Sequence, residues 1–187
     1  MKRCLIIAAA AAAVACALPT LAAAQNAGHD AAAHDIQLRL DGYQEVPSVS
    51  TSGKAFFWAD LEGNNNRVAW RLRYEDLEGD VQQAHIHFAR RGVAGGIVLF
   101  LCSNLGNGPA GTPMCPGTRS GQLSGFITPA DISPDVPATA GAIAQGIGPG
   151  EYEELGRALR AGALYANVHS TRWPAGEVRG QLWVKER

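Results

Sequence analysis

The chain lacks a hydrophobic run long enough to span a membrane. Its longest apolar stretch, at residues 5–18, has 14 residues (18 − 5 + 1), whereas a membrane-spanning helix needs about 20. The chain also lacks an excess of either charge, because 16 Lys and Arg residues stand against 17 Asp and Glu residues, and it has no block of basic residues. We therefore expect a protein that is neither transmembrane nor a nucleic-acid binder.

The first residues have the order of a secretory signal peptide. Lys2 and Arg3 precede the apolar stretch, and the small residues 22–24 follow it. Export signals of this kind are removed directly after such small residues. We predict cleavage between Ala24 and Gln25, so that the signal peptide covers residues 1–24.

The rest of the chain is expected to form one exported domain. Residues 25–35 are polar and rich in alanine without periodicity, which predicts a flexible leader. Residues 36–187 have the length of one ordinary domain, located in the periplasm or secreted. A lipoprotein acylated at Cys16 is the less favoured alternative, because residues 13–15 lack the leucine that usually precedes such a cysteine.

Cysteine is scarce, with four residues in the chain, and two of them fall in the predicted signal peptide. The remaining pair, Cys102 and Cys115, predicts a disulfide in an exported protein. The bridge closes a loop of 14 residues (115 − 102 + 1) and stabilises the fold by about 3 kcal/mol in the chain-entropy model. The wide spacing, with no CxxC motif, disfavours a metal-binding or redox-active pair.

Alternation of apolar and polar residues dominates the predicted domain. In the clearest run, Trp70 and Leu72 alternate with Arg71 and Arg73, which is typical of a strand with one buried face. Eight such segments, separated by turns rich in glycine and asparagine, predict an all-β protein that is an antiparallel β-sandwich or Greek-key barrel. The segments lie at about residues 36–40, 54–61, 68–74, 83–88, 97–101, 121–127, 163–170 and 177–185.

Helical spacing occurs once, just before the last two predicted strands. Tyr152, Leu155 and Leu159 recur along one face, and we predict a short helix over residues 151–161. A capped turn is predicted at residues 128–131. The segment 133–150 is rich in proline, glycine and alanine and is expected to be an irregular loop.

Three histidines fall inside predicted strands. His85 and His87 are two residues apart and therefore project from one face, opposite Ile86. His169 lies on one face of a later strand. If the two strands are neighbours, three imidazoles converge, and neutral imidazole is a good ligand for copper and zinc. A structural polar network without a metal is the other interpretation, and it is the simpler one.

Four further polar residues lie on the same strand faces. Tyr165 and Asn167 share a face with His169, and Glu177 and Arg179 alternate with apolar residues in the last predicted strand. We expect these side chains to form a polar network that includes an ion pair between Glu177 and Arg179 or orients an imidazole. The sequence contains no nucleophile elbow, phosphate-binding loop or dinucleotide-binding motif, so no catalytic residues are assigned.

Four segments in order resemble the CHRD domain, first described in chordin. They are residues 40–47 with 53–55, residues 84–88 with 92–98, residues 162–170 and residues 174–182. The resemblance runs from about Ile36 to Val184 and identifies an exported bacterial member. It implies a β-rich extracellular binding module, since the copies in chordin belong to an antagonist that binds growth factors of the BMP class. It brings no established catalytic residues.

A looser similarity of arrangement links the chain to copper/zinc superoxide dismutase, which has a His-x-His strand, a later histidine and a late arginine. His85, His87, His169 and Arg179 occur here in that order. The primary hypothesis is therefore a non-catalytic binding module for an unidentified extracytoplasmic protein or ligand. The alternative is a copper- or zinc-binding protein, or a superoxide dismutase-like redox enzyme, that uses the three histidines.

Overall fold

The computed structural model describes residues 35–62, 67–128 and 140–184, all within the compact unit Ala33–Arg187. The predicted signal peptide, almost all of the predicted leader and most of the predicted turn at residues 128–131 lie outside the described residues. Among the residues described, no helix is both long and apolar enough to cross a membrane.

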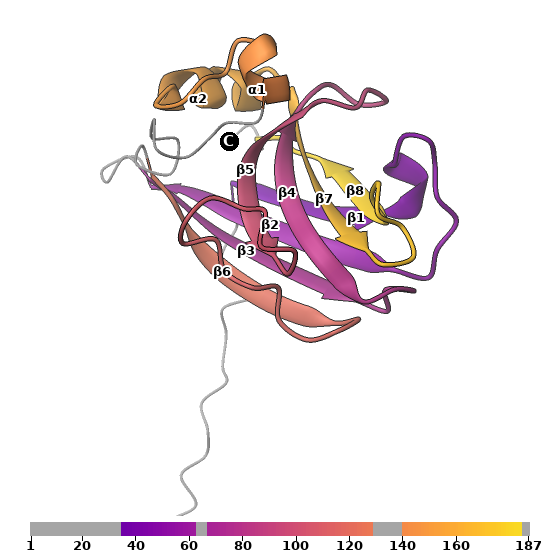
Figure 1. Cartoon of the computed structure of the whole chain (residues 1–187). Coiled ribbons are helices and arrows are strands. Elements are labelled where there is room, and N and C mark those ends of the chain that lie inside the picture. Colours follow the sequence, from indigo (N-terminus) through magenta and orange to yellow (C-terminus); the bar gives the residue numbers. More distant parts are fainter. Residues whose placement is uncertain (1–34, 63–66, 129–139, 185–187) are drawn as a thin grey trace, which may run out of the picture. The chain divides into compact units, whose positions relative to one another are not determined.

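Eight strands form one antiparallel sheet in the order β5-β4-β7-β8-β1-β2-β3-β6 (Figure 1). All eight predicted strands are present, and the predicted all-β antiparallel class is confirmed. The main difference is at the last strand, which ends at Gln181 and not near residue 185. The bounds are β1 Ile36–Asp41, β2 Lys54–Glu62, β3 Arg67–Glu75, β4 Val81–Phe88, β5 Gly96–Ser103, β6 Gly121–Ile127, β7 Leu164–Ser170 and β8 Val178–Gln181.

The two faces of the sheet differ as the alternation predicts. Phe57 of β2 pairs with Leu72 of β3, and both side chains are buried in the core. The next pair along, Trp58 and Arg71, is half-buried on the opposite face, where the guanidinium lies 4.9 Å from the centroid of the indole. A change of register by one residue would exchange these two faces, so the hydrophobic pattern specifies the pairing.

The sheet curls so that its edge strands share one core. Val98 of β5 and Ile127 of β6 belong to the same cluster of buried apolar residues, although β5 and β6 are the two outermost strands in the sheet order. Residues of both edge strands also line one pocket. The two ends of the sheet therefore pack together as the layers of a sandwich do, but they belong to one hydrogen-bonded sheet.

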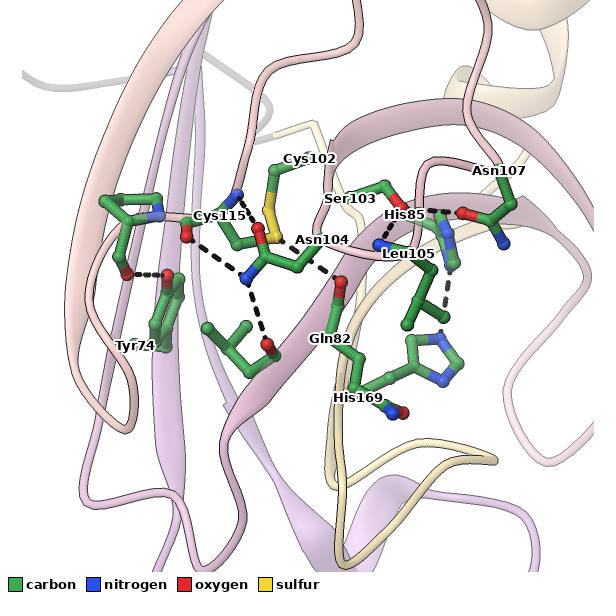
Figure 2. Close-up of a disulfide and its surroundings, with 12 residues drawn as sticks. Tyr74, Gln82, His85, Cys102, Ser103, Asn104, Leu105, Asn107, Cys115 and His169 are labelled. Carbon is green, nitrogen blue, oxygen red and sulfur yellow. Dashed lines mark hydrogen bonds between the residues drawn. A yellow bond between two sulfur atoms is a disulfide. The ribbon is translucent and has the colours of Figure 1, made fainter.

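The predicted disulfide between Cys102 and Cys115 is present and ties the end of β5 to the segment before β6 (Figure 2). Asn104 closes the loop around it. The side-chain oxygen of Asn104 accepts the N–H of Cys115 at 2.9 Å, and its amide nitrogen donates to the carbonyl oxygen of Val81 at 3.1 Å. Both cysteines are buried in the core, so the bridge ties the edge strand β5 to the segment that leads into the other edge strand, β6.

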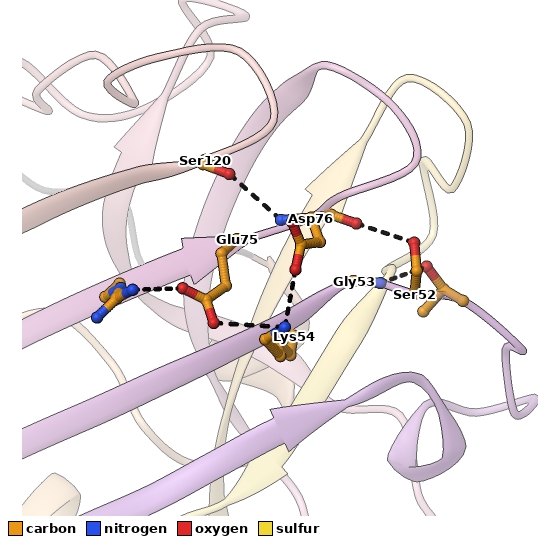
Figure 3. Close-up of polar contacts among 8 residues, drawn as sticks. Ser52, Gly53, Lys54, Glu75, Asp76 and Ser120 are labelled. Atoms are coloured by element: carbon orange, nitrogen blue, oxygen red, sulfur yellow. Dashed lines mark hydrogen bonds and ion pairs between the residues drawn. The ribbon is translucent and has the colours of Figure 1, made fainter.

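A polar cluster fastens the corner where β3 ends. The amino group of Lys54 lies 2.7 Å from a carboxylate oxygen of Asp76 and 3.4 Å from one of Glu75 (Figure 3). The backbone of Asp76, which has a φ of 57°, is held on both sides: its N–H donates to Ser120 and its carbonyl accepts from Ser52. These contacts join the start of β2 and the end of β3 to the segment that leads into β6.

In the described part of the chain, two short α-helices precede β7, and a 3-10 turn, η1 Gly42–Gln44, follows β1. The helix predicted at residues 151–161 is confirmed as α2 Tyr152–Arg160. The second helix, α1 Ala140–Ala144, lies where an irregular loop was predicted, so that part of the prediction was wrong. Its alanines favour the helical state, and Ala142 is fully buried next to β5.

Candidate functional site

The side chains of interest lie on the face of β4 and β7 that points away from the core. The two strands are neighbours and pair antiparallel, with His85 opposite Asn167 and His87 opposite Tyr165. Ile86 and Ala166, which also pair, face the core. The alternation therefore collects the imidazoles, the phenol and the amide on one face.

His85, His87 and His169 converge, and we call this cluster the three-histidine site. Each offers one ring nitrogen, and these nitrogens lie within 4.8 Å of one another. The closest pair, Nδ1 of His85 and Nε2 of His169, is 3.2 Å apart (Figure 2). All three side chains are buried, with exposed fractions of 0%, 7% and 6%.

Backbone carbonyls set the tautomers of two of these histidines. Nδ1 of His87 lies 2.9 Å from the carbonyl oxygen of Gly95, and Nδ1 of His169 lies 2.9 Å from that of Pro174. A carbonyl oxygen only accepts, so each Nδ1 carries the proton and each Nε2 keeps a lone pair. Nδ1 of His85 then donates to Nε2 of His169, which leaves Nε2 of His85 as a lone pair as well.

Two of these lone pairs have no partner. Nε2 of His85 and Nε2 of His87 are buried and form no hydrogen bond. Leaving a buried acceptor unpaired costs about 1–3 kcal/mol. Two unpaired acceptors beside a third imidazole therefore leave this cluster able to accept a hydrogen-bond donor or a cation.

The electrostatic environment keeps the imidazoles neutral. Burial lowers the pKa of His85 from 6.5 to about 2, and the neighbouring histidines contribute to the lowering. Burial lowers the pKa of His87 to about 4, although the carbonyl of Gly95 and the amide of Asn167 oppose the change. Burial also lowers the pKa of His169. Neutral imidazole is the form that binds a metal.

Two residues of the predicted polar network, the aromatic Tyr165 and the cationic Arg179, lie beside the three-histidine site. The rings of His87 and Tyr165 are stacked, with centroids 4.7 Å apart. The guanidinium of Arg179 lies 3.4 Å from the centroid of Tyr165 and donates to the carbonyl oxygens of Arg90 and Val93. Arg179 is 2% exposed, so these contacts hold a buried cation in place.

Glu177 has other partners. One of its carboxylate oxygens accepts from the hydroxyl of Thr51 and from the backbone N–H of Glu78, both at 2.7 Å. Glu177 and Arg179, both among the described residues, do not form the ion pair that the sequence predicts. Glu177 thus joins the loops that carry Thr51 and Glu78 to the segment before β8.

The acidic residue near Arg179 is Glu45, which the sequence reasoning did not single out. Its side chain is 7% exposed, and Oε1 has no hydrogen-bond partner. Burial raises the pKa of Glu45 from 4.5 to about 7, while the charge of Arg179 and a hydrogen bond from Asn167 act in the opposite direction. Glu45 therefore belongs to the same buried polar cluster as the histidines.

The three-histidine site has the composition of a site for a first-row metal ion. Ligand nitrogens bound to one zinc ion at 2.0–2.1 Å are about 3–4 Å apart. The ring nitrogens found here lie within 4.8 Å of one another, so the rings must turn for one ion to contact all three, and the ring of His85 must turn its Nδ1–H away from Nε2 of His169. Two Nδ1–H groups already donate to backbone carbonyls, which is the arrangement that orients histidine ligands around metals in proteins.

Comparisons with known proteins place the chain in a family. A family model described as CHRD domain matches residues 36–182. No curated protein and no solved structure shows a significant match to the chain. The family match spans both strands that carry the three histidines as well as the disulfide. Because it covers 147 of 187 residues (182 − 36 + 1), the chain belongs to the CHRD domain family.

Proposed function

We propose that this protein is an exported, non-catalytic binding module whose three-histidine site holds one copper or zinc ion. Membership of the CHRD family supports a binding or interaction module in general. The disulfide is consistent with an oxidising, extracytoplasmic location. The metal is the more specific part of the proposal.

One observation carries the metal assignment. Nε2 of His85 and of His87 are buried lone pairs without a partner, in a cluster where one ring nitrogen from each of His85, His87 and His169 lies within 4.8 Å of the others. One hydrogen-bond donor would satisfy only one of these two lone pairs, whereas a cation can take both. Nε2 of His169 becomes a third ligand when it exchanges the N–H of His85 for the ion. Imidazole nitrogen without thiolate favours copper or zinc over the harder calcium and magnesium ions.

Titration calorimetry of the purified protein with Zn²⁺ and with Cu²⁺ tests the proposal. We expect one ion per chain and a rise in melting temperature, since a ligand at 1,000 times its Kd stabilises the folded state by about 4 kcal/mol. His87→Ala should weaken binding by more than about 100-fold, beyond the effect of losing an outer-sphere partner. If neither ion binds or raises the melting temperature at neutral pH, the metal assignment is wrong.

Two control variants separate this site from other sources of binding. Gln83→Ala changes a neighbour on the same strand, whose side chain bonds Asn107 at 3.1 Å, and it should leave metal affinity unchanged. The double change His29→Ala and His34→Ala removes the two remaining histidines of the chain. It should also leave the high-affinity site intact, and loss of that site in this variant would move the assignment to the amino-terminal segment.

A further inference from the structure

Asn167 lies where the three-histidine site meets the charged pair Glu45 and Arg179. It is 2% exposed and projects from β7 opposite His85 of β4. Its side-chain oxygen Oδ1 is 3.1 Å from Nε2 of His169. Hydrogen bonding by its amide also raises the pKa of His87 and lowers the pKa of Glu45. This one side chain therefore contacts both the histidines and the acidic residue behind them.

The contact between Asn167 and His169 joins two acceptors. Nδ1 of His169 donates to the carbonyl oxygen of Pro174, so a neutral ring has only a lone pair at Nε2. Oδ1 of Asn167 likewise offers lone pairs. Two acceptors 3.1 Å apart repel each other. The N–H of His85 faces Nε2 of His169 in this structure, and a cation that replaces it would lie against both acceptors. Two ligand atoms about 2.1 Å from one ion and at a right angle to each other are about 3 Å apart.

Rotation of the amide by 180° would remove this repulsion, but Glu45 opposes it. A hydrogen bond from the side chain of Asn167 lowers the pKa of Glu45, as donation by the NH₂ group to the carboxylate does. With Glu45 ionised, rotation would turn Oδ1 toward the carboxylate and would replace a charge-assisted hydrogen bond with a contact between acceptors. The carboxylate of Glu45 therefore keeps Oδ1 directed toward the histidines.

Glu45 is itself held in place. Arg179 provides the nearby positive charge, and Gly176 packs against the carboxylate so closely that a Cβ atom there would lie 2.4 Å from Oε1. The loop that carries Glu45 is bonded to η1, because the backbone N–H of Val49 donates to the carbonyl oxygen of Gly42 at 2.8 Å. The orientation of Asn167 thus depends on contacts that are fixed before any ion arrives.

We propose that Oδ1 of Asn167 is a fourth ligand of the metal site and that Glu45 is a positioning residue that holds the amide in its ligating orientation. This inference rests on the proposed function. The resulting set of three imidazole nitrogens and one amide oxygen is of borderline hardness and suits Cu²⁺ and Zn²⁺ better than Cu⁺, which prefers softer ligands.

Cu²⁺ binding and electron paramagnetic resonance of the copper-loaded protein test the inference. Asn167→Ala removes the oxygen ligand, and we expect affinity for Cu²⁺ to fall about 10-fold or more, with a changed copper hyperfine splitting. Asn167→Asp keeps an oxygen at the same place and should retain binding within a few-fold. Gln83→Ala is the control for a change on the same sheet face and should leave both affinity and spectrum unchanged.

Glu45 is tested with a matched pair of variants. Glu45→Gln keeps one oxygen that can accept the amide of Asn167, and we expect a spectrum close to that of the wild type. Glu45→Ala removes the acceptor and should shift the hyperfine splitting toward that of Asn167→Ala. If Glu45 is only structural, both variants should have a lower melting temperature and an unchanged copper spectrum.

The outcomes distinguish this inference from the proposed function. If Asn167→Ala folds and binds Cu²⁺ with wild-type affinity and spectrum while His87→Ala does not bind, the oxygen ligand is wrong and the metal site stands. If Asn167→Ala does not fold, Asn167→Asp and the two Glu45 variants test the inference in its place. An unchanged copper spectrum in Glu45→Ala then shows that Glu45 does not position the amide of Asn167. If the wild type binds no metal, both proposals fall.

Discussion

The imidazole of His87 lies flat against the phenol ring of Tyr165, with the two ring planes 3° apart. This stack arises because His87 on β4 and Tyr165 on β7 are direct cross-strand neighbours. The guanidinium of Arg179 lies over the same phenol ring, 3.4 Å from its centroid. Together with the bond from Nδ1 to the carbonyl oxygen of Gly95, the stack leaves the imidazole of His87 one orientation.

The first prediction concerns this stack. Tyr165→Leu removes the ring contact with His87 and the cation–π contact with Arg179, which contribute about 1 and 2 kcal/mol. We expect the free energy of unfolding to fall by about 3 kcal/mol and the affinity for Zn²⁺ to fall about 10-fold. Urea denaturation and titration calorimetry measure the two effects.

Tyr165→Phe is the control, since it keeps the ring and loses only the hydroxyl, which accepts a long 3.4 Å bond from the N–H of Gly95. This variant should stay within about 1 kcal/mol of the wild type. Equal loss of metal affinity in the two variants would show that the hydroxyl, and not the stack, is important.

The second prediction concerns the pH dependence of stability without metal. An unfolded chain protonates its histidines near pH 6.5, whereas the folded protein keeps His87 neutral to about pH 4 and His85 to about pH 2. Between pH 6.5 and pH 4 the unfolded state therefore binds more protons, and the free energy of unfolding falls as the pH falls. For His87 alone the loss approaches about 3 kcal/mol at pH 4.

Glu45 contributes with the opposite sign. Its pKa is raised to about 7, so the folded state holds a proton that the unfolded chain releases above pH 4.5. This single group stabilises the fold as the pH falls from 7 to 4.5 and offsets only part of the loss from the histidines. Denaturation curves at pH 7, 6 and 5 should therefore show decreasing stability in the wild type and a smaller slope in His87→Gln. A flat profile in the wild type would contradict the buried neutral imidazoles.

Much of the sheet follows from the sequence pattern because several strands have one buried face. Phe57 and Leu72, for example, alternate with half-exposed neighbours. Strand β5 has no such alternation, and its apolar run at residues 97–101 was recognised by the glycines that precede it. The order of the strands in the sheet does not follow from this pattern. It depends on pairing between distant segments such as β4 and β7, which local alternation does not specify.

The candidate site was predicted in part for the same reason. Alternation placed His85 and His87 on one face, but their meeting with His169 requires that β4 and β7 be neighbours. Glu45 was missed because its burial comes from contacts with Gly176 and Arg179, far along the chain. An acidic residue in a turn segment is usually solvated, so nothing local distinguishes it.

The third prediction concerns the disulfide. The double change Cys102→Ala and Cys115→Ala should lower the free energy of unfolding by about 2–4 kcal/mol, because the bridge reduces the conformational entropy of the unfolded chain. The loss should not be confined to the loop, since both sulfurs lie in the core between the sheet edges. Thiol labelling of the native, unreduced protein should find no reactive sulfur at these positions. Two free thiols there would contradict the bridge.

The fourth prediction concerns Gly176, which has a φ of 135° and packs against the carboxylate of Glu45. A Cβ atom at this position would lie 2.4 Å from Oε1 and 2.7 Å from Cδ of Glu45, so Gly176→Ala must displace that side chain. Gly92→Ala is the matched control, because Gly92 also has a positive φ, of 77°, and a Cβ atom there meets nothing within 4 Å.

We expect Gly92→Ala to lower the free energy of unfolding by about 1 kcal/mol through backbone strain alone. Gly176→Ala should lower it by about 2 kcal/mol more, since a forced shift of a buried side chain adds to the strain. Only Gly176→Ala should also change the spectrum of bound Cu²⁺, in the direction of Glu45→Ala, because both release the amide of Asn167. Denaturation curves and copper spectra of the two glycine variants measure these effects. If both variants had the same free energy of unfolding and the same copper spectrum, displacement of Glu45 would have no effect on the site.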